Sequence, residues 1–262
     1  MREEIQPTRR VVIKVGTQVI TNKDSRIVGK ILGKLVEQIA YLYEQGIISV
    51  LVSSGSVIAG KEVMSKGLKS QDRITRRQIF SAVGQPRMMR HYYNLFQDHG
   101  MRCAQVLATK RDFDPGKHRE NMVNCYEGLL AEGVIPIANE DDAVSLSMST
   151  FTDNDELASL VAELIHADML IMLTDTDGLY NGHPDDAGST LIKHVRIDQP
   201  VEQYVQKSTK GEAEGRGGME SKLRIAKKMA KMNIPTFIAN GKRDNVIIDL
   251  VYGEEVGTKV TT

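Results

Sequence analysis

One local pattern recurs along the chain. A segment with helical periodicity ends in glycine or asparagine, and a short run rich in valine and isoleucine follows at once. The pattern occurs in "YEQGIISVLVS", "QDHGMRCAQVLA", "LAEGVIPIAN" and "AKMNIPTFIAN". Glycine and asparagine adopt the left-handed conformation that closes a helix, and the runs after them are too short and too β-branched to be helices. The order helix, cap, strand predicts an α/β fold with a mainly parallel sheet that helices cover on both faces.

The rest of the chain supplies the other elements of such a sheet. Residues 9–15 are predicted to form the first strand, and residues 27–45 and 75–98 two long helices, the second of which Pro86 should kink or interrupt. The remaining predicted elements are helices at 118–132, 155–166 and 219–232 and strands in "ADMLIMLTD" and "GTKV". Without a linker or a low-complexity tract, residues 1–262 are expected to form a single domain.

Composition narrows the class of protein. The 34 basic residues balance the 34 acidic ones, which gives no electrostatic reason to expect nucleic acid or a membrane surface as a partner. Cys103 and Cys125 are too few for a disulfide framework and lack the spacing of metal ligands. The charged N-terminus has no apolar stretch typical of a secretory signal, and no apolar run has the length of a membrane span. These features predict a soluble cytoplasmic protein.

Polar residues follow four of the predicted strands immediately. These clusters are Lys14 with Gly16, "SSGS" at 53–56, "NEDDAV" at 139–144, and Thr174 with Asp175. In a doubly wound sheet, ligands bind at the carboxyl ends of the strands. One such cluster would indicate a turn, whereas four on the same edge predict a binding site.

The segment "GRGGMESKL" at 215–223 indicates what the site could bind. Glycines allow backbone amides to approach an anion, a helix N-terminus adds partial positive charge, and Lys222 adds a full charge. With Lys14 on the first strand, the pattern suits a polyphosphate whose charge grows in a transition state. A flexible loop before an ordinary helix is the alternative. The sequence has no zinc-ligand cluster, Walker A motif, dinucleotide fingerprint or nucleophile elbow, so no metal site built from side chains is predicted.

These motifs together resemble those of the glutamate 5-kinases, which are members of the amino acid kinase superfamily. The segments that carry the resemblance are "VVIKVGTQVIT", "VSSGSVIAGKEVM", "AVGQPRMM", "IANEDDAV", "TDNDELASLVA", "LTDTDGLY", "GRGGMESKL" and "EEVGT". They cover roughly residues 9–258 in the family's order. The resemblance implies a three-layer α/β/α sandwich with a mainly parallel central sheet. It also implies phosphorylation of the γ-carboxylate of L-glutamate by ATP with Mg²⁺, the first step of proline biosynthesis.

The resemblance also implies roles for individual residues. Lys14 and Lys222 would stabilise the transferring phosphoryl group, and Asp155 would hold both lysines in position. The implied glutamate site consists of Ser54, Gly55, Ser56, Asn139, Asp142, Asp153 and Asn154, in which Asp142 would pair with the substrate ammonium group. The implied nucleotide site consists of Lys14, Gly16, Thr174, Asp175, Arg216, Gly217, Gly218, Met219, Glu220, Ser221 and Lys222. Asp153 and its neighbours would also suit the N-cap of the following helix.

The chain departs from the family pattern at four positions. Arg216 replaces the usual threonine, Ser56 replaces a small apolar residue, Thr152 replaces a glycine, and Pro86 is unusual in its helix. Many relatives continue into a C-terminal domain that resembles RNA-modification modules of the PUA type, and no such domain is expected here. The resemblance further implies that the protein forms a homo-oligomer. It also leads us to expect functional coupling to glutamate-5-semialdehyde dehydrogenase.

Two other functions remain open from the sequence. One is another kinase of the superfamily that acts on a nucleoside monophosphate, carbamate, aspartate or an isoprenoid phosphate. The other is a non-catalytic sensor of nucleotides or amino acids on the same fold. The acids and amides of "NEDDAV" and "TDND" favour an amino-acid ammonium group over a second phosphate, which would require arginines.

Overall fold

The structure is a computed structural model that describes residues 10–64, 68–144, 153–205 and 218–262. Its strands are β1 (Arg10–Val15), β2 (Ile48–Ser53), β3 (Arg102–Ala108), β4 (Val134–Glu140), β5 (Met169–Thr174), β6 (His194–Arg196), β7 (Thr236–Asn240) and β8 (Thr258–Thr261). Its α-helices are α1 (Thr17–Ile20), α2 (Gly29–Glu44), α3 (Ser56–Val63), α4 (Arg73–Asp98), α5 (Lys117–Ala131), α6 (Asn154–Leu164), α7 (Met219–Lys231) and α8 (Val246–Val251). Two short 3₁₀ helices, η1 (Lys110–Phe113) and η2 (Glu202–Tyr204), complete the elements of these residues.

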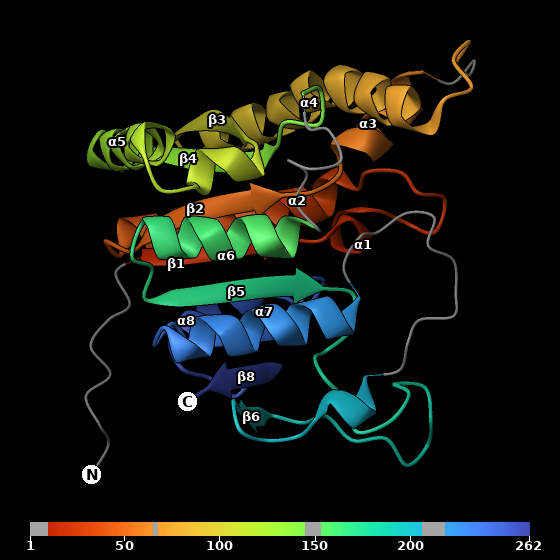
Figure 1. Ribbon diagram of the computed structural model, residues 1–262, viewed down its shortest axis with the longest axis vertical. Coiled ribbons are helices and arrows are strands. Elements are labelled where there is room, and N and C mark those ends of the chain that lie inside the picture. The colour runs from red at the N-terminus through yellow and green to blue at the C-terminus, as the bar shows by residue number, and fades with distance from the viewer. Residues whose placement is uncertain (1–9, 65–67, 145–152, 206–217) are drawn as a thin grey trace.

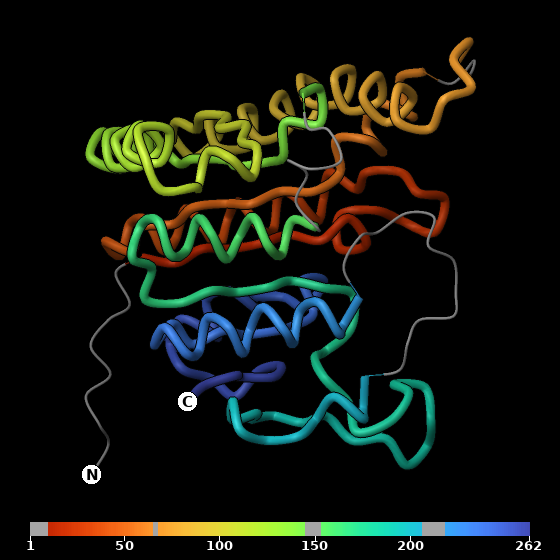
Figure 2. The backbone as a smooth tube through the Cα atoms, viewed as in Figure 1, coloured from red at the N-terminus to blue at the C-terminus, as the bar shows by residue number. Residues whose placement is uncertain are grey.

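The strands form one eight-stranded sheet in the order β3-β4-β2-β1-β5-β7-β8-β6. All neighbouring strands pair in parallel except β7 and β8, which are antiparallel, so the predicted mainly parallel sheet is confirmed. Figure 2 shows the chain starting in the middle of the sheet, building one edge and then returning to build the other. This return places β1 between β2 and β5, the type of position at which α/β sheets bind ligands.

Alternating residues of β1 divide the core between the two faces of the sheet. Val11 and Ile13 pack with residues of α1, α2, α4 and α8, whereas Val12 packs with residues of α5, α6 and α7. Successive side chains of a strand point to opposite faces, which explains the division. Figure 1 shows α6 and α7 in front of the sheet, with α2 and α8 behind it. The predicted three-layer α/β/α sandwich is therefore confirmed.

The four helix ends that the recurring pattern marks all have the left-handed conformation. The φ angles are 76° at Gly46, 69° at Gly100, 65° at Gly133 and 60° at Asn233. A residue with a β-carbon rarely adopts such an angle, and glycine and asparagine tolerate it best. Each cap lets the chain reverse at once into the next strand, which is why the pattern predicts the topology well.

The helix α4 runs through Pro86 without interruption, so the predicted break is absent. Proline removes one helical amide and leaves the carbonyl of Ala82 without its usual donor. Both Pro86 and Ala82 are exposed, so water can hydrate that carbonyl and the helix continues. Among the helices of the described residues, including the 26-residue α4, none is long and apolar enough to cross a membrane.

Helices α3 and α4 approach each other so closely that only glycine fits at their crossing. A β-carbon on Gly60 would lie 1.8 Å from the backbone oxygen of Phe80, and one on Gly84 would lie 1.7 Å from that of Ser56. Real β-carbons do not approach backbone so closely, because packed interiors leave no space for overlap. The contact brings the middle of α4 against the first turn of α3, at the carboxyl end of β2.

We therefore predict that Gly84→Ala separates the two helices and lowers the free energy of unfolding by about 1–3 kcal/mol, the usual cost of overpacking. Urea denaturation followed by circular dichroism measures the change. Gly128→Ala is the matched control, since Gly128 lies within α5 with nothing within 4 Å of an added β-carbon. That control should stabilise the protein by about 0.5–1 kcal/mol through helix propensity. Equal effects of the two changes would contradict the role of the crossing.

Candidate functional site

The site lies at the carboxyl ends of β1, β2, β4 and β5. The N-termini of α6 and α7 meet the same edge, toward the right in Figure 1, because each helix runs antiparallel to the strands that it covers. Lys14 is the fifth residue of β1 and shares the face of Val12, which packs against α6 and α7. Alternation along the strand thus directs this one lysine toward both helix N-termini.

Two lysines and one aspartate form a buried cluster at this edge. The Nζ atom of Lys14 lies 2.7 Å from Oδ1 of Asp155, and the Nζ atom of Lys222 lies 3.0 Å from Oδ2. The exposed fractions of the side chains are 5% for Lys14, 7% for Lys222 and 0% for Asp155. Each carboxylate oxygen therefore faces one ammonium group. The structure brings together the three residues that the sequence predicts as catalytic.

Burial changes the protonation of this cluster. Burial lowers the pKa of Lys14 from its ordinary value, Asp155 opposes the shift, and Lys222 adds to it. Burial by itself would raise the pKa of Asp155, but the two lysines hold it below its ordinary value. The lowered pKa keeps the carboxylate of Asp155 ionised at neutral pH, where it contacts the Nζ atoms of both lysines. Ammonium groups beside the N-termini of two helices suit an anion.

The N-terminus of α6 is fixed by Asp153. Its side chain caps the helix by accepting hydrogen bonds from the amides of Asp155 and Glu156 at 2.9 and 3.0 Å. The Oδ2 atom of Asp153 also accepts a bond of 2.5 Å from the hydroxyl of Ser221 on α7. The two helix N-termini are thus tied together beside the lysines. The sequence assigns Asp153 to glutamate binding or to an N-cap, and the structure shows the N-cap.

A hydrogen-bonded group of amides and hydroxyls lies next to the lysine cluster. The side-chain amide of Asn154 donates to Oδ1 of Asn139 at 2.9 Å and to Oγ of Ser54 at 3.0 Å. The amide of Asn139 in turn donates to Oγ of Ser56 at 3.4 Å. Asn154, Ser54, Asn139 and Ser56 come from separate parts of the sequence. The structure brings these four predicted substrate-binding residues together, and the hydroxyl of Ser56 takes part.

Gly55 shapes the turn that carries these serines. Its φ angle is 111°, and a β-carbon there would lie 2.7 Å from the Cδ1 atom of Ile20. Both the conformation and the contact therefore favour glycine. The turn ends β2 and starts α3, so Ser54 faces the edge of the sheet while Ser56 is buried against α4.

The carboxylate of Asp142 is held by two residues that the sequence analysis does not identify. Its Oδ1 atom accepts from Nε of Arg77 at 2.9 Å and lies 2.8 Å from Nη2 of the same guanidinium. Its Oδ2 atom accepts from the hydroxyl of Ser81 at 2.8 Å, and that hydroxyl also lies 3.1 Å from Oγ of Ser56. Arg77 and Ser81 lie on α4, away from every strand end. In the sequence, the feature that indicates this contact is a polar residue, Ser81, on the apolar face of α4 one turn before Gly84.

The described residues among those predicted around the nucleotide lie at the ends of β1 and β5 and at the start of α7. The amide of Gly16 donates to the carbonyl of Leu173 at 3.1 Å, which holds β1 against β5 beside Lys14. Thr174 and Asp175 follow β5, and Thr174 donates to Asp175 at 3.3 Å. Gly218, Met219, Glu220 and Ser221 form the N-terminus of α7, where Gly218 and Glu220 are exposed. Arg216 and Gly217, and Thr152 of the substrate loop, lie outside the described residues.

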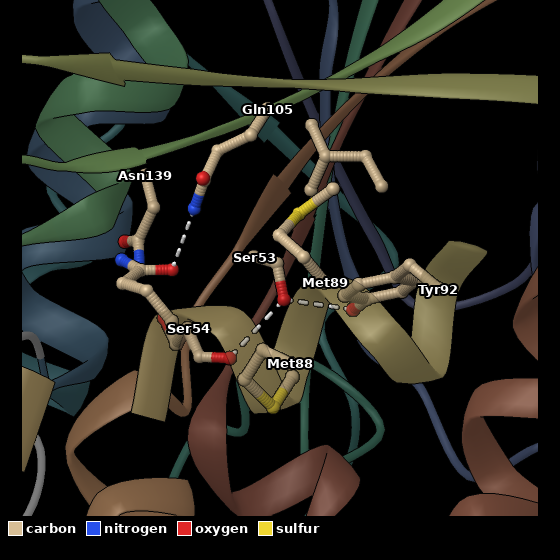
Figure 3. Close-up of a pocket in the computed structure, with 9 residues that line it drawn as sticks. Ser53, Ser54, Met88, Met89, Tyr92, Gln105 and Asn139 are labelled. Carbon is tan, nitrogen blue, oxygen red and sulfur yellow. Dashed lines mark hydrogen bonds between the residues drawn. The ribbon is translucent and has the colours of Figure 1, made fainter. Parts of the chain in front are cut away.

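A small cavity lies behind the amide and hydroxyl group (Figure 3). Ser53, Ser54, Tyr92 and Asn139 line it together with residues of α4 and β3. The Oγ atom of Ser53 lies 2.7 Å from the hydroxyl of Tyr92 and donates to the carbonyl of Ser54 at 3.1 Å. A cavity of about 10 Å³ is at the lower limit for one water molecule. It therefore belongs to the packing behind the site and is too small for a substrate.

Across residues 10–64, 68–144, 153–205 and 218–262, no group of three histidine, cysteine, aspartate or glutamate side chains is placed to hold a metal ion. The donors at the edge are ammonium, amide and hydroxyl groups, which suit the oxygens of phosphates and carboxylates.

Comparison with known proteins identifies the family. The model of the amino acid kinase family matches residues 9–240. The glutamate 5-kinase of Bacteroides thetaiotaomicron is 42% identical over 246 residues, which are 94% of this chain and 68% of that protein. The glutamate 5-kinase of Alkaliphilus metalliredigens is 34% identical over 260 residues and is covered to 97% of its length. These similarities extend over the whole candidate site.

Solved structures agree on the fold. The carbamate kinase of Giardia lamblia, bound to AMP-PNP, superposes with a TM-score of 0.69 at 16% identity and covers 97% of this chain and 99% of that one. The UMP kinase of Bacillus anthracis has a TM-score of 0.68 at 16% identity and covers 98% and 97%. Their acceptors differ, so this likeness shows the fold alone.

We predict that Asp155→Asn destabilises the protein by about 3–5 kcal/mol, because it removes the carboxylate that pairs with both buried lysines, Lys14 and Lys222. The pKa of Asp155 in the folded protein is below its ordinary value of 3.8. Its contribution is therefore complete above about pH 4 and is lost as the pH falls through the lowered pKa. Urea denaturation of both proteins between pH 3 and pH 7 should show a difference that shrinks only at the acid end.

Asp244→Asn is the matched control for this experiment. Asp244 pairs with a single lysine, Lys34, and the exposed fraction of its side chain is 72%. Exposed ion pairs contribute at most about 1 kcal/mol, so the control should change stability by less than that. A loss for Asp155→Asn no larger than the loss for the control would contradict the account of the buried cluster.

Proposed function

Because the chain belongs to the amino acid kinase family, we propose that it transfers the γ-phosphoryl group of ATP to the γ-carboxylate of L-glutamate. The product is L-glutamyl 5-phosphate, and the reaction is the first step of proline biosynthesis. The observation that carries the proposal is the buried Asp155, which holds Lys14 and Lys222 between a helix N-terminus and a group of amides and hydroxyls. The similarity to glutamate 5-kinases supports glutamate as the acceptor.

Phosphoryl transfer between two oxygens requires little covalent chemistry from the protein. The phosphoryl group carries its charge on three oxygens while the attacking and leaving oxygens lie in line, so positioning and charge stabilisation account for most of the catalysis. Lys14 and Lys222 reach the site from different layers, the sheet and α7. With Asp155 between them, the two ammonium groups are fixed before the substrates bind. Fixed charges in a buried site stabilise the transition state without reorganisation.

The N-terminus of α7 suits the phosphates of ATP. Its first amides have no helical partner and the helix dipole favours an anion there. Gly218 is exposed and an added β-carbon would meet nothing within 4 Å, so a phosphate can approach the backbone. Mg²⁺ would enter bound to the phosphates, since it usually binds through substrate phosphates and one or two carboxylates. The exposed Asp175 at the end of β5 is a carboxylate of this kind.

The remaining expectations from the family resemblance belong to the same proposal. They are a homo-oligomer, a cytoplasmic location and coupling to glutamate-5-semialdehyde dehydrogenase. An acyl phosphate that carries a free α-amine cyclises readily. Direct transfer of glutamyl 5-phosphate to the dehydrogenase would prevent its loss by cyclisation.

The test of the proposed function is an acceptor panel. The protein would be incubated with ATP, Mg²⁺ and hydroxylamine, and with L-glutamate, L-aspartate, UMP or carbamate in turn, and acyl hydroxamate and ADP would be measured. Hydroxamate that forms only with L-glutamate is the expected result. ADP release with another acceptor alone would overturn glutamate as substrate and retain the kinase, whereas no turnover with any acceptor would favour a non-catalytic sensor.

We predict that Lys222→Ala retains the fold and loses about 100- to 1,000-fold in kcat, because it removes charge that stabilises the transition state. Asp155 keeps Lys14 as its partner in this variant, so the buried carboxylate is not left alone. Lys231→Ala is the matched control, since Lys231 is exposed on the same helix, and its kcat should match that of the wild type. Wild-type turnover of Lys222→Ala would contradict the role of this lysine.

A further inference from the structure

Arg77 holds the carboxylate assigned to the substrate ammonium group, yet it lies outside the residues that the family resemblance implies. Its Nε and Nη2 atoms both contact Oδ1 of Asp142, at 2.9 and 2.8 Å. Its Nη2 atom also lies 3.6 Å from Oε2 of Glu140. The exposed fractions of the side chains are 38% for Arg77, 6% for Asp142 and 5% for Glu140. The guanidinium therefore lies between two buried carboxylates and the solvent.

The hydrogen-bonding capacity of this pair is only partly used. A guanidinium has five N–H donors, and within the described part of the chain Nη1 of Arg77 donates to no atom. A carboxylate offers about four acceptor positions, of which Arg77 occupies two and the hydroxyl of Ser81 one. One acceptor position on Asp142 and the two donors of Nη1 on Arg77 thus remain for a ligand. Asp142 can accept from a cationic group, and Arg77 can donate to an anionic group beside it.

This pair is connected to the reacting end of the site by hydrogen bonds. The connection runs from Asp142 through Ser81 and Ser56 to Asn139, and from there to Asn154. Asn154 precedes Asp155, which holds both lysines. The pair formed by Arg77 and Asp142 therefore belongs to the same hydrogen-bonded group as the residues beside the lysines.

We propose that Arg77 binds the α-carboxylate of the acceptor while Asp142 binds its ammonium group, so that the pair selects an α-amino acid. This inference rests on the proposed function, because it concerns the glutamate of that reaction. Both groups of an α-amino acid stand on one carbon and require a cation and an anion side by side. The fork of N–H donors in arginine matches a carboxylate. Asp142 alone would accept any amine of suitable length.

A purely structural role for Arg77 predicts a different result. If Arg77 only positioned Asp142, its loss would weaken binding of every acceptor that carries the ammonium group. If it binds the α-carboxylate, its loss weakens only acceptors that carry that charge. L-Isoglutamine separates the two cases, because it keeps the ammonium group and the γ-carboxylate of glutamate and replaces the α-carboxylate by a neutral amide. 4-Aminobutyrate, which lacks the α-carboxylate altogether, is the second probe.

The experiment compares kcat/KM for the three acceptors in the wild type and in Arg77→Met, by the hydroxamate assay. A hydrogen bond between charged groups changes binding by about 10- to 100-fold, so the wild type should prefer glutamate over isoglutamine by that factor. In Arg77→Met the value for glutamate should fall by about 10- to 100-fold and the values for the other two acceptors by less than about threefold. The KM for ATP should not change.

Two further variants control the comparison. Arg87→Met removes an arginine of the same helix that pairs with Glu62 at 2.9 Å, and it should leave all values unchanged. Arg77→Lys keeps the charge beside Asp142 and loses the fork, so it tests the proposal even if Arg77→Met does not fold. It should reduce the preference for glutamate by about tenfold or less.

The outcomes separate this inference from the proposed function. A wild type that forms no glutamyl hydroxamate overturns the proposed function and this inference with it. A wild type that does so, with a preference for glutamate that both Arg77 variants leave unchanged, overturns the inference alone. The same holds if the values for all three acceptors fall by equal factors, because that is the result of a positioning role. Loss of the glutamate preference alone supports the inference.

Discussion

The pair of ion contacts on Asp155 is the interaction on which the site depends. An unpaired buried lysine is costly, and two adjacent lysines repel each other, so a shared carboxylate is required to hold both as cations. The three side chains come from β1, α6 and α7. They meet because the carboxyl end of β1 and the N-termini of the two helices lie at the same edge of the sheet. The cap formed by Asp153 and its bond to Ser221 fix that convergence. The fold thus positions two charges before any ligand binds.

The second half of the site is held together mainly by hydrogen bonds between amides and hydroxyls. Amides and hydroxyls of Asn154, Asn139 and Ser56 lead from the lysines to Asp142 and Arg77. The close crossing of α3 and α4 at Gly60 and Gly84 places Ser81 beside Ser56, so this half depends on helix packing. In the proposed reaction, the lysines would bind the phosphoryl group, and Arg77 and Asp142 would bind the amino acid. An acceptor with one carboxylate at each end and an ammonium group at one of them fits this arrangement.

Much of this arrangement could be predicted from the sequence, for physical reasons. Gly46 and Asn233 mark helix ends because their left-handed backbone excludes most other residues, and Lys14 is conspicuous because charge is rare on a buried strand. Arg77 and Ser81 could not be found at strand ends, because α4 reaches the site through tertiary packing that sequence periodicity does not describe. Pro86 does not interrupt α4, because Ala82 is exposed and water can hydrate its carbonyl.

We propose that the cluster of Lys14, Asp155 and Lys222 directs the phosphoryl group of ATP to the γ-carboxylate of glutamate. L-Glutamate labelled with ¹⁸O in both γ-carboxylate oxygens tests it most directly. When the α-amine attacks the acyl carbon of glutamyl phosphate, the ring closes and phosphate leaves with the bridging oxygen. Transfer to glutamate therefore yields inorganic phosphate that contains one ¹⁸O atom for each ADP, which ³¹P NMR detects. Phosphate without ¹⁸O would show that water is the acceptor and would overturn transfer to glutamate.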